Sequence, residues 1–321
     1  MPSFAIEPRI FMLGLRAAKT VAVVDGNFDQ RERELVAAAM RALAPELVTQ
    51  VDIDALETIT GEELAAEVAD ELTRTRIIQV MLIMAMIDTE VDEREHALIK
   101  DFAKALDVDE PRLANLKQVL NEHHTLVKLD LNRSSRMVKD AVGWAYEKDG
   151  FGGVLKTIAP FISKKFAVDE ALAWRYRKLG LLPENTFGRA YWTHMTERGF
   201  GFPGEPGGFP EVFIKHDCCH TLGGYDTDPI GECEVVSFIS GFMEADPFWY
   251  LFMVCVHMHL GIETFDDNPL GFAAFDAERC MNAMARGMAV NTDLYVPGVD
   301  WWSLFPEPID AVRARYNIAP A

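Results

Sequence analysis

The sequence predicts an all-α protein that consists of two helical domains. The first 125 residues are rich in Ala, Leu, Glu and Arg, poor in Pro, and show no sustained alternation of apolar and polar residues. From residue 166 onward aromatic residues, Gly and Pro become more frequent, and all five cysteines lie there. We therefore expect an N-terminal helical domain at 1–125, a connector at 126–165 and a mostly helical C-terminal domain at 166–321.

Helical periodicity predicts the individual elements. The stretch QRERELVAAAMRAL (30–43) places Leu35, Ala39, Met40 and Leu43 on one face, as in an amphipathic helix. Further expected helices lie within GEELAAEVADELTRTRIIQVMLIMAMI (61–87), EREHALIKDFAKAL (93–106), EVFIKHDCCHTL (211–222), GECEVVSFISGFME (231–244) and PFWYLFMVCVHMHLGI (247–262). Another is expected to run through Tyr191 and His194, and a last helix begins near Pro308.

Composition and charge argue against two kinds of partner. The formal net charge is −19 at pH 7 and the isoelectric point is near 4.8, so we expect neither nucleic-acid binding nor electrostatic adhesion to an anionic bilayer. The start of the chain lacks the pattern of a signal peptide, which predicts a cytoplasmic protein. The most apolar runs, at 77–87 and 248–262, are too short to span a membrane and predict buried helices. An odd number of cysteines without a CxxC pair predicts free thiols.

An acidic pattern occurs twice in the N-terminal part, in VVDGNFDQRE (23–32) and MIDTEVDERE (86–95). Asp29 and Asp92 suit the residue before a helix, and Glu32 and Glu95 then fall three positions later, which predicts two capping boxes.

Capping leaves Asp25 and Asp88, one turn upstream, unexplained. Carboxylates at matching places in two helical hairpins could meet and bind a divalent cation through oxygen, although the alternating pattern of a calcium loop is absent. Capping alone and a metal-binding acidic pocket both stay open. The residues of this second candidate site are Asp25, Glu32, Asp88 and Glu95.

These paired acidic segments resemble the tellurite-resistance TerB-like family over roughly residues 12–120. The resemblance implies a compact all-helical module in which the acidic positions line a suspected metal pocket. The second copy departs from the pattern, because Thr89 stands where Gly is usual.

The richest cluster of metal-ligand types is KHDCCHTLGGYDTDPIGECE (215–234). On a helix, His216 and His220 share one face, Asp217 is adjacent, and Glu232 begins the next helix after a turn. Two imidazoles and two carboxylates suit Zn²⁺, and iron or manganese with less preference. Cys218 points away from this face and Cys219 faces it only in part, so we interpret them as small buried apolar residues.

The pattern His216-Asp217-x-x-His220 followed after eleven residues by Glu232 resembles the ubiquinone-biosynthesis family that contains the fourth Coq protein. Two further segments, LPENTFGRAYWTHM and DWWSLFPEPIDAVRARYNI, extend the resemblance to about 172–318. It implies a mostly helical fold that binds zinc through these four side chains beside an apolar groove for a polyprenyl chain. It also implies a role in ubiquinone (coenzyme Q) assembly, as a scaffold for the other biosynthetic proteins or in oxidative decarboxylation of the ring. The implied partner is a polyprenylated quinone precursor, and peripheral contact with the inner face of a membrane is a further expectation.

Several interpretations stay open beside this one. The apolar side chains at 238–262 are candidates for a lipid groove or simply for the core, and His257 and His259 are interpreted as polar residues of a packed helix. The main alternative is a non-catalytic protein that binds a prenyl lipid and recruits partners. In this alternative the TerB-like part responds to metal ions or to stress. A phosphohydrolase of the His-Asp type would need His194 and Asp246 as further ligands. The apolar candidates are Phe238, Ile239, Phe242, Phe248, Trp249, Phe252 and Met253.

Overall fold

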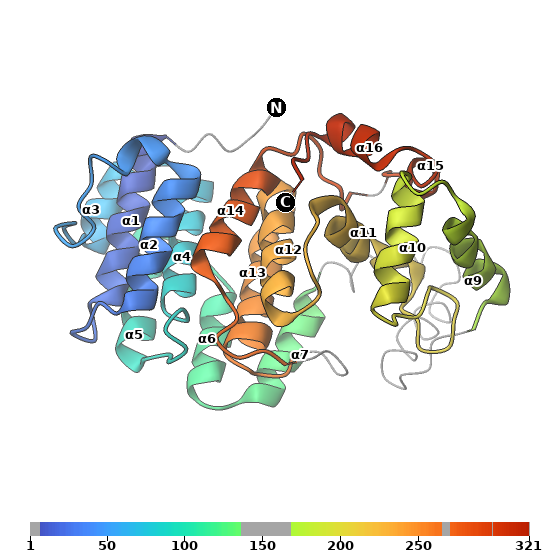
Figure 1. Cartoon of the computed structure of the whole chain (residues 1–321). Coiled ribbons are helices and arrows are strands. Elements are labelled where there is room, and N and C mark those ends of the chain that lie inside the picture. Colours follow the sequence, from blue (N-terminus) through green and yellow to red (C-terminus); the bar gives the residue numbers. More distant parts are fainter. Residues whose placement is uncertain (1–6, 136–167, 265–269, 297, 321) are drawn as a thin grey trace. The chain divides into compact units, whose positions relative to one another are not determined.

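The computed structural model describes residues 7–135, 168–264, 270–296 and 298–320 (Figure 1). Within these residues the chain forms 15 α-helices and no strand, and the structure is 63% helical, which confirms the all-α prediction. No helix in the described part of the chain combines the length and the apolar character needed to cross a membrane.

The helices form two compact units whose boundaries differ from those expected from the sequence. Unit 1 contains Met1–Leu131, Asp228–Gly241 and Pro247–Met288, and unit 2 contains Asn132–Thr227, Phe242–Asp246 and Ala289–Ala321. Part of the expected C-terminal domain thus groups with the N-terminal helices. Residues 136–165, most of the expected connector, lie outside the described residues.

Side-chain caps fix where the N-terminal helices of unit 1 begin. α2 (Gln30–Leu43) starts with the box formed by Asp29 and Glu32, and α5 (Glu93–Leu106) with the box formed by Asp92 and Glu95, so both predicted capping boxes are confirmed. The other N-terminal elements are α1 (Pro8–Ala22), η1 (Pro45–Leu47), α3 (Gly61–Glu67), α4 (Glu71–Met84), α6 (Arg112–Leu120) and α7 (His124–Ser134).

α4 occupies the centre of this group because it packs against α1, α5 and α6. Its residues from Ile77 to Met84 are buried, with the exception of Val80. The apolar run at 77–87 therefore belongs to the core, as predicted.

Four later elements complete unit 1: α12 (Pro229–Phe242), α13 (Pro247–Val254), the π-helical segment η4 (Cys255–His259) and α14 (Ala277–Met288). α14 lies against α2 (Figure 1). The backbones of α12 and α14 also touch, since a Cβ atom on Gly287 would lie 2.0 Å from the carbonyl oxygen of Phe238 and one on Gly241 would lie 2.5 Å from that of Met284. Only glycine fits at this contact.

His259 joins three segments of unit 1. Its Nδ1 accepts the amide N–H of Phe275 at 3.0 Å, so its Nε2 carries the proton and donates to the carbonyl oxygen of Ile87 at 2.9 Å. The neutral imidazole satisfies both bonds, and burial lowers the pKa of His259. His257 is likewise buried, and its Nδ1 accepts the amide N–H of Thr264. Both residues are polar members of a packed helix.

Unit 2 is built around aromatic side chains. Its elements are α9 (Glu170–Arg177), η2 (Lys178–Leu181), α10 (Phe187–Glu197), η3 (Glu211–Phe213), α11 (Ile214–Gly223), α15 (Trp301–Leu304) and α16 (Ile309–Tyr316). The rings of Phe187 and Tyr191 on α10 pack against Phe305, with centroid separations of 5.3 and 5.4 Å.

The segment before α16 also caps α10. The amide N–H of Phe187 donates to the carbonyl oxygen of Glu307, and that of Gly188 to Phe305, both at 2.8 Å. A Cβ atom on Gly188 would lie 2.8 Å from the Cβ of Phe305, so glycine permits this approach. Two segments that are far apart in the sequence, LPENTFGRAYWTHM and DWWSLFPEPIDAVRARYNI, therefore lie side by side.

Candidate functional site

The first candidate site is carried by two consecutive helices, α11 and α12, and by the turn that joins them. Gly224, the residue that follows α11, has a left-handed φ of 77°, and its amide N–H donates to the carbonyl oxygen of His220 at 2.8 Å. Asp228 accepts the amide N–H of Gly231 at 2.7 Å, and Glu232 follows in the first turn of α12. The turn is short, so it returns Glu232 toward the histidines.

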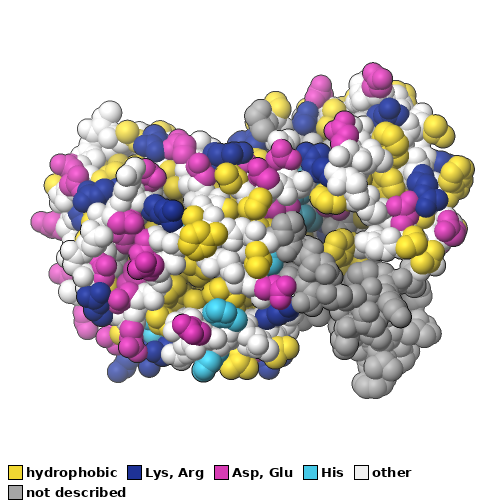
Figure 2. Space-filling model, turned by 60° about the horizontal axis from the view of Figure 1, so that its bottom comes forward, with side chains coloured by type: hydrophobic (Ala, Val, Ile, Leu, Met, Phe, Trp, Pro, Cys, Tyr) yellow, Lys and Arg dark blue, Asp and Glu magenta, His cyan; other side chains and the backbone are white. Residues whose placement is uncertain are grey.

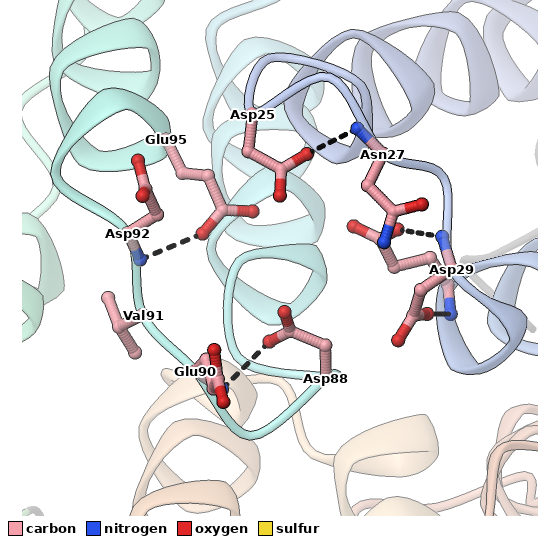
Figure 3. Close-up of a pocket in the computed structure, with 9 residues that line it drawn as sticks. Asp25, Asn27, Asp29, Asp88, Glu90, Val91, Asp92 and Glu95 are labelled. Atoms are coloured by element: carbon pink, nitrogen blue, oxygen red, sulfur yellow. Dashed lines mark hydrogen bonds between the residues drawn. The ribbon is translucent and has the colours of Figure 1, made fainter.

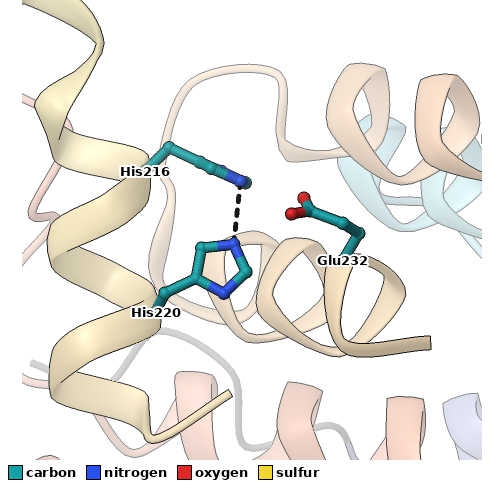
Figure 4. Close-up of side chains that lie close together, drawn as sticks. All are labelled: His216, His220 and Glu232. Atoms are coloured by element: carbon teal, nitrogen blue, oxygen red, sulfur yellow. Dashed lines mark hydrogen bonds between the residues drawn. The ribbon is translucent and has the colours of Figure 1, made fainter. Parts of the chain in front are cut away.

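His216, His220 and Glu232 come together, and their side chains point toward one another (Figure 4). Each offers one ligand atom, and these atoms all lie within 4.8 Å of one another. The Nε2 atoms of the two histidines are 3.1 Å apart. Two nitrogens bound to one zinc ion at about 2.0–2.1 Å, with the tetrahedral angle of about 109° at the ion, stand about 3.3–3.4 Å apart. The observed separation, at which the two rings share a hydrogen bond, is close to that distance.

The turn also selects the tautomer of His220. Its Nδ1 lies 3.3 Å from the carbonyl oxygen of Tyr225, and a carbonyl can only accept, so Nδ1 donates the proton. Nε2, the atom that faces His216, therefore carries the lone pair that a metal ion requires. The ring is 1% exposed, so this orientation is also enforced by packing.

Two groups hold α11 in place at its C-terminal end. Arg313 of α16 donates through Nε to the carbonyl oxygen of Leu222 at 2.9 Å. Arg198, at the end of α10, donates to the carboxylate of Asp226 at 2.9 Å and to the hydroxyl of Thr227 at 3.1 Å. The hydrogen bond from Arg198 is the main cause that lowers the pKa of Asp226. The turn that orients His220 is thereby fastened to α10.

A third imidazole, that of His194, packs on His220. The two rings are stacked, with centroids 5.5 Å apart and planes inclined by 30°, and His194 is buried. The sequence nominates His194 only for the phosphohydrolase alternative. Nothing in its spacing indicates this packing, because α10 is a separate helix whose orientation to α11 is set by tertiary contacts.

Asp217 does not belong to the group of three ligand atoms. It follows His216 on α11, and its charge, after burial, helps to raise the pKa of the phenol of Tyr191 and of the thiols of Cys218 and Cys219. Asp217 as a fourth ligand stays a prediction. Both thiols are fully buried, which fits the interpretation of Cys218 and Cys219 as small apolar residues.

The second candidate site is a pocket of about 120 Å³ in unit 1, between the two copies of the acidic repeat (Figure 3). All four residues predicted for an acidic site line it. The complete lining is Asp25, Asn27, Asp29, Glu32, Asp88, Glu90, Val91, Asp92 and Glu95.

The two upstream aspartates have a local role that capping did not explain. The carboxylate of Asp25 accepts the amide N–H of Asn27 at 2.8 Å, and that of Asp88 accepts the amide N–H of Glu90 at 2.9 Å. Each aspartate thus forms an Asx turn, in which its side chain accepts from the amide two residues later, just before the helix cap.

Burial and the neighbouring carboxylates raise the pKa values of acidic side chains in this pocket. Burial, followed by the charges of neighbouring carboxylates, raises the pKa of Glu32 to about 7 and that of Glu95 to about 8. Burial also raises the pKa of Asp88. A divalent cation would offset this repulsion, so the pocket is chemically suited to Ca²⁺ or Mg²⁺. Binding of a cation there stays a prediction.

Comparisons of the chain with protein-family models and with curated proteins give no match. The two resemblances therefore depend on the short motifs quoted above, and the geometry of His216, His220 and Glu232 is separate support for a metal site.

Proposed function

We propose that this chain is a metal-dependent protein of ubiquinone biosynthesis that acts on, or holds, a polyprenylated ring precursor. The observation that carries the proposal is the approach of His216, His220 and Glu232, the residues that match the family motif. Zn²⁺ is the proposed cation, because imidazole nitrogens and a carboxylate oxygen are among its usual ligands. Asp217 is the proposed fourth ligand, and other proteins of the pathway are the proposed partners.

A cation at this site would bind the carboxylate or phenolate of the ring and stabilise the charge that develops as the carboxylate leaves. Exchange of a ring carboxyl for a hydroxyl releases CO₂ and adds one oxygen atom, so the reaction also consumes O₂ and two electrons from a reductant. Residues of the chain orient the proposed ligand atoms toward one another. Nδ1 of His220 donates to the Tyr225 carbonyl, so the neutral imidazole presents the lone pair of Nε2 to the site, and Glu232 offers a carboxylate oxygen.

Burial limits which side chains can contact a polyprenyl tail. Among the candidates at 238–262, Phe238, Ile239 and Phe252 are 0% exposed, and Met253 is half-buried. Phe242, Phe248 and Trp249 are at most 5% exposed. These side chains serve as core in the structure, so the proposal does not assign the tail to them.

The metal assignment is tested by the variant Glu232→Gln, which removes the charge and keeps the shape. We expect its affinity for zinc to fall at least about tenfold, because a carboxylate ligand is lost. Zinc retained after equilibrium dialysis of the purified protein is measured by elemental analysis. Glu197→Gln, at an exposed position on α10, is the control. Equal zinc retention in Glu232→Gln and the parent removes Glu232 from the ligand set.

Catalysis is tested with purified protein, O₂, a reductant and a prenylated 4-hydroxybenzoate-type substrate. Release of CO₂ from the ring that is lost in Glu232→Gln supports an enzyme. The acidic pocket favours a second candidate, a non-catalytic prenyl-lipid-binding or scaffold protein whose TerB-like part responds to metal ions. Tight binding of the substrate without turnover, together with retention of the other pathway proteins in a pull-down, supports that candidate instead.

A further inference from the structure

The hydrogen bond between His216 and His220 can form with either ring as the donor. Their Nε2 atoms are 3.1 Å apart (Figure 4), and each nitrogen of a neutral imidazole donates or accepts according to the tautomer. This contact therefore does not decide which nitrogen of His220 carries the proton. The carbonyl oxygen of Tyr225 decides it, because Nδ1 can bind that oxygen only as a donor.

The carbonyl of Tyr225 lies in the turn after α11, and Arg198 binds the two residues that follow it. Arg198 donates through Nη2 to the carboxylate of Asp226 at 2.9 Å and through Nε to the hydroxyl of Thr227 at 3.1 Å. Its Nη1 donates to the carbonyl oxygen of His194 on α10 at 3.4 Å. One rigid, planar guanidinium thus joins the end of α10 to the turn that contains the Tyr225 carbonyl.

α10 restrains the imidazole of His220 in a second way. His194 lies one helical turn before Arg198, and its ring stacks on that of His220 with centroids 5.5 Å apart. Stacking restricts the plane of the ring, but a proton can sit on either nitrogen without any change of that plane. The position of the proton therefore depends on the turn, and not on the stacking.

An exposed ion pair would be ordinary by itself. In Figure 2, Lys and Arg side chains lie beside Asp and Glu side chains at many places on the surface. The side chain of Asp226 is 64% exposed, so its charge adds little to stability through the pairing with Arg198 alone. Arg198 differs from other paired arginines in its position, because its hydrogen bonds reach the turn whose carbonyl selects the tautomer of His220.

We infer that Arg198 is a positioning residue of the metal site. By holding the turn, it keeps the Nδ1 proton of His220 on the Tyr225 carbonyl and leaves the lone pair of Nε2 directed toward the site. The inference rests on the proposed function, since it assigns a role at the same site, and it adds a residue that lies outside the motif. Arg198 acts through the turn and contacts none of the three ligand side chains directly.

Arg198→Gln tests the inference in the metal-free, full-length protein. At about pH 8, where imidazoles are neutral, long-range ¹H–¹⁵N correlation spectra of the ¹⁵N-histidine-labelled protein show which nitrogen of each ring carries the proton. The signals of His220 are identified by their loss in His220→Asn. We expect a single Nδ1–H tautomer in the parent and a mixture in Arg198→Gln, in which the two nitrogen shifts move toward each other. Arg198→Lys keeps the charge but not the fork, so it should restore the parent tautomer in part.

Arg177→Gln is the matched control. Arg177 also belongs to unit 2 and donates to the carboxylate of Glu205 at 2.6 Å, but it does not bind the turn. In urea unfolding the two variants should lose a similar amount of stability, whereas only Arg198→Gln should change the tautomer. An unchanged tautomer in Arg198→Gln, or an equal change in Arg177→Gln, would overturn the inference.

Zinc affinity, measured by competition with a chelator, gives a second readout. Arg198→Gln should bind zinc about tenfold more weakly than the parent, since loss of the groups that orient a metal ligand typically lowers affinity by about 10–100-fold. Arg177→Gln should bind like the parent. Equal affinity of Arg198→Gln and a zinc-binding parent would also overturn the inference. Absence of zinc binding by the parent would instead remove the metal from the proposed function, while the tautomer comparison, made without metal, would still decide the role of Arg198.

Discussion

Thr89 adopts a left-handed backbone conformation at the place where the first copy of the acidic repeat has Gly26. Its φ is 75°, and that of Gly26 is 94°. A β-branched residue is a steric outlier in this region, whereas glycine is not. The departure of the second copy from the usual pattern therefore places strain in the loop that carries Asp88.

Thr89→Gly is expected to stabilise the protein by about 0.5–1 kcal/mol. Relief of the left-handed strain contributes about 1–2 kcal/mol, and the greater freedom of glycine in the unfolded chain offsets part of it. The free energy of unfolding is measured by urea titration. Gly26→Thr, the reciprocal change, should destabilise by about 1–2 kcal/mol. Destabilisation by Thr89→Gly would contradict the interpretation of strain.

Glu32 and Glu95 give the protein a defined dependence on pH. Their pKa values are raised from about 4.5 to about 7 and about 8, so the native state binds these protons more tightly than the unfolded chain does. The resulting stability is fully present below pH about 4.5 and is lost as the pH rises toward 8. Without added divalent cations, the contribution of this pocket therefore falls between pH 5 and pH 8.

Glu95→Gln is expected to weaken this dependence. The variant should gain about 1–3 kcal/mol relative to the parent at pH 8 and much less at pH 5, since the amide does not ionise. Urea unfolding at the two pH values gives the comparison. Glu63→Gln serves as the control, because Glu63 occupies the same capping-box position at the start of α3 but is exposed. A gain in Glu95→Gln that is equal at both pH values would show that repulsion in the pocket is not its cause.

Parts of the candidate site were predictable because they are local. The spacing of His216 and His220 and a short turn to Glu232 bring these side chains together without any knowledge of the rest of the fold. The stacking of His194 and the hydrogen bond from His220 to the Tyr225 carbonyl were not predictable. The first depends on the packing of α10 against α11, and the second uses a backbone atom that no residue type reveals.

The start and end of a helix could be predicted where its capping residues and its apolar periodicity lie within one segment of the sequence. α2 begins and ends where its pattern predicts, and Leu35 and Met40 of its apolar stripe are buried. Val36 and Ala38 are buried as well, so the buried surface is wider than the stripe. α2 packs against both α1 and α14, and periodicity cannot indicate which distant helix covers a given face.

Because the backbones of α12 and α14 are in contact, one added methyl group at this contact is expected to lower the stability strongly. Gly287→Ala is expected to destabilise the protein by about 3 kcal/mol, because the new Cβ meets the backbone of α12, which cannot rotate away. Thermal and urea unfolding measure the change. Gly14→Ala in α1 is the matched control, since a Cβ atom there meets nothing within 4 Å and alanine favours the helix by about 0.5–1 kcal/mol. Similar effects of the two substitutions would contradict the packing described.

At the scale of the whole molecule, the N-terminal helices depend on the later ones. The indole N–H of Trp249 donates to the carbonyl oxygen of Leu131 at 3.0 Å, His259 binds the carbonyl oxygen of Ile87, and Arg41 pairs with Glu278. Two of these contacts join the expected N-terminal domain to the expected C-terminal domain, and the contact of Trp249 joins the C-terminal domain to the expected connector. Composition changes along a chain mark segments of different character, but they do not show which segments share a core.

A fragment that ends at Leu131 is therefore expected to fold poorly. Without α14 the fragment exposes the part of α2 that packs against α14, and without η4 it loses the hydrogen bond from His259 to the carbonyl oxygen of Ile87. We expect strong binding of a hydrophobic dye and a broad urea transition, compared with a sharp transition for unit 1 in the full chain. A cooperative transition of the fragment with little dye binding would show that residues 1–131 form an independent domain.

The contact of Gly241 with α14 and of Gly287 with α12 has a mechanical consequence. Helices whose backbones touch have no layer of adaptable side chains between them, so they shift as one stiff piece. α12 carries Glu232 in its first turn, and α14 lies against α2, the helix that Glu32 helps to cap. A displacement of α12 is therefore expected to move α14 with it, and α14 in turn contacts α2.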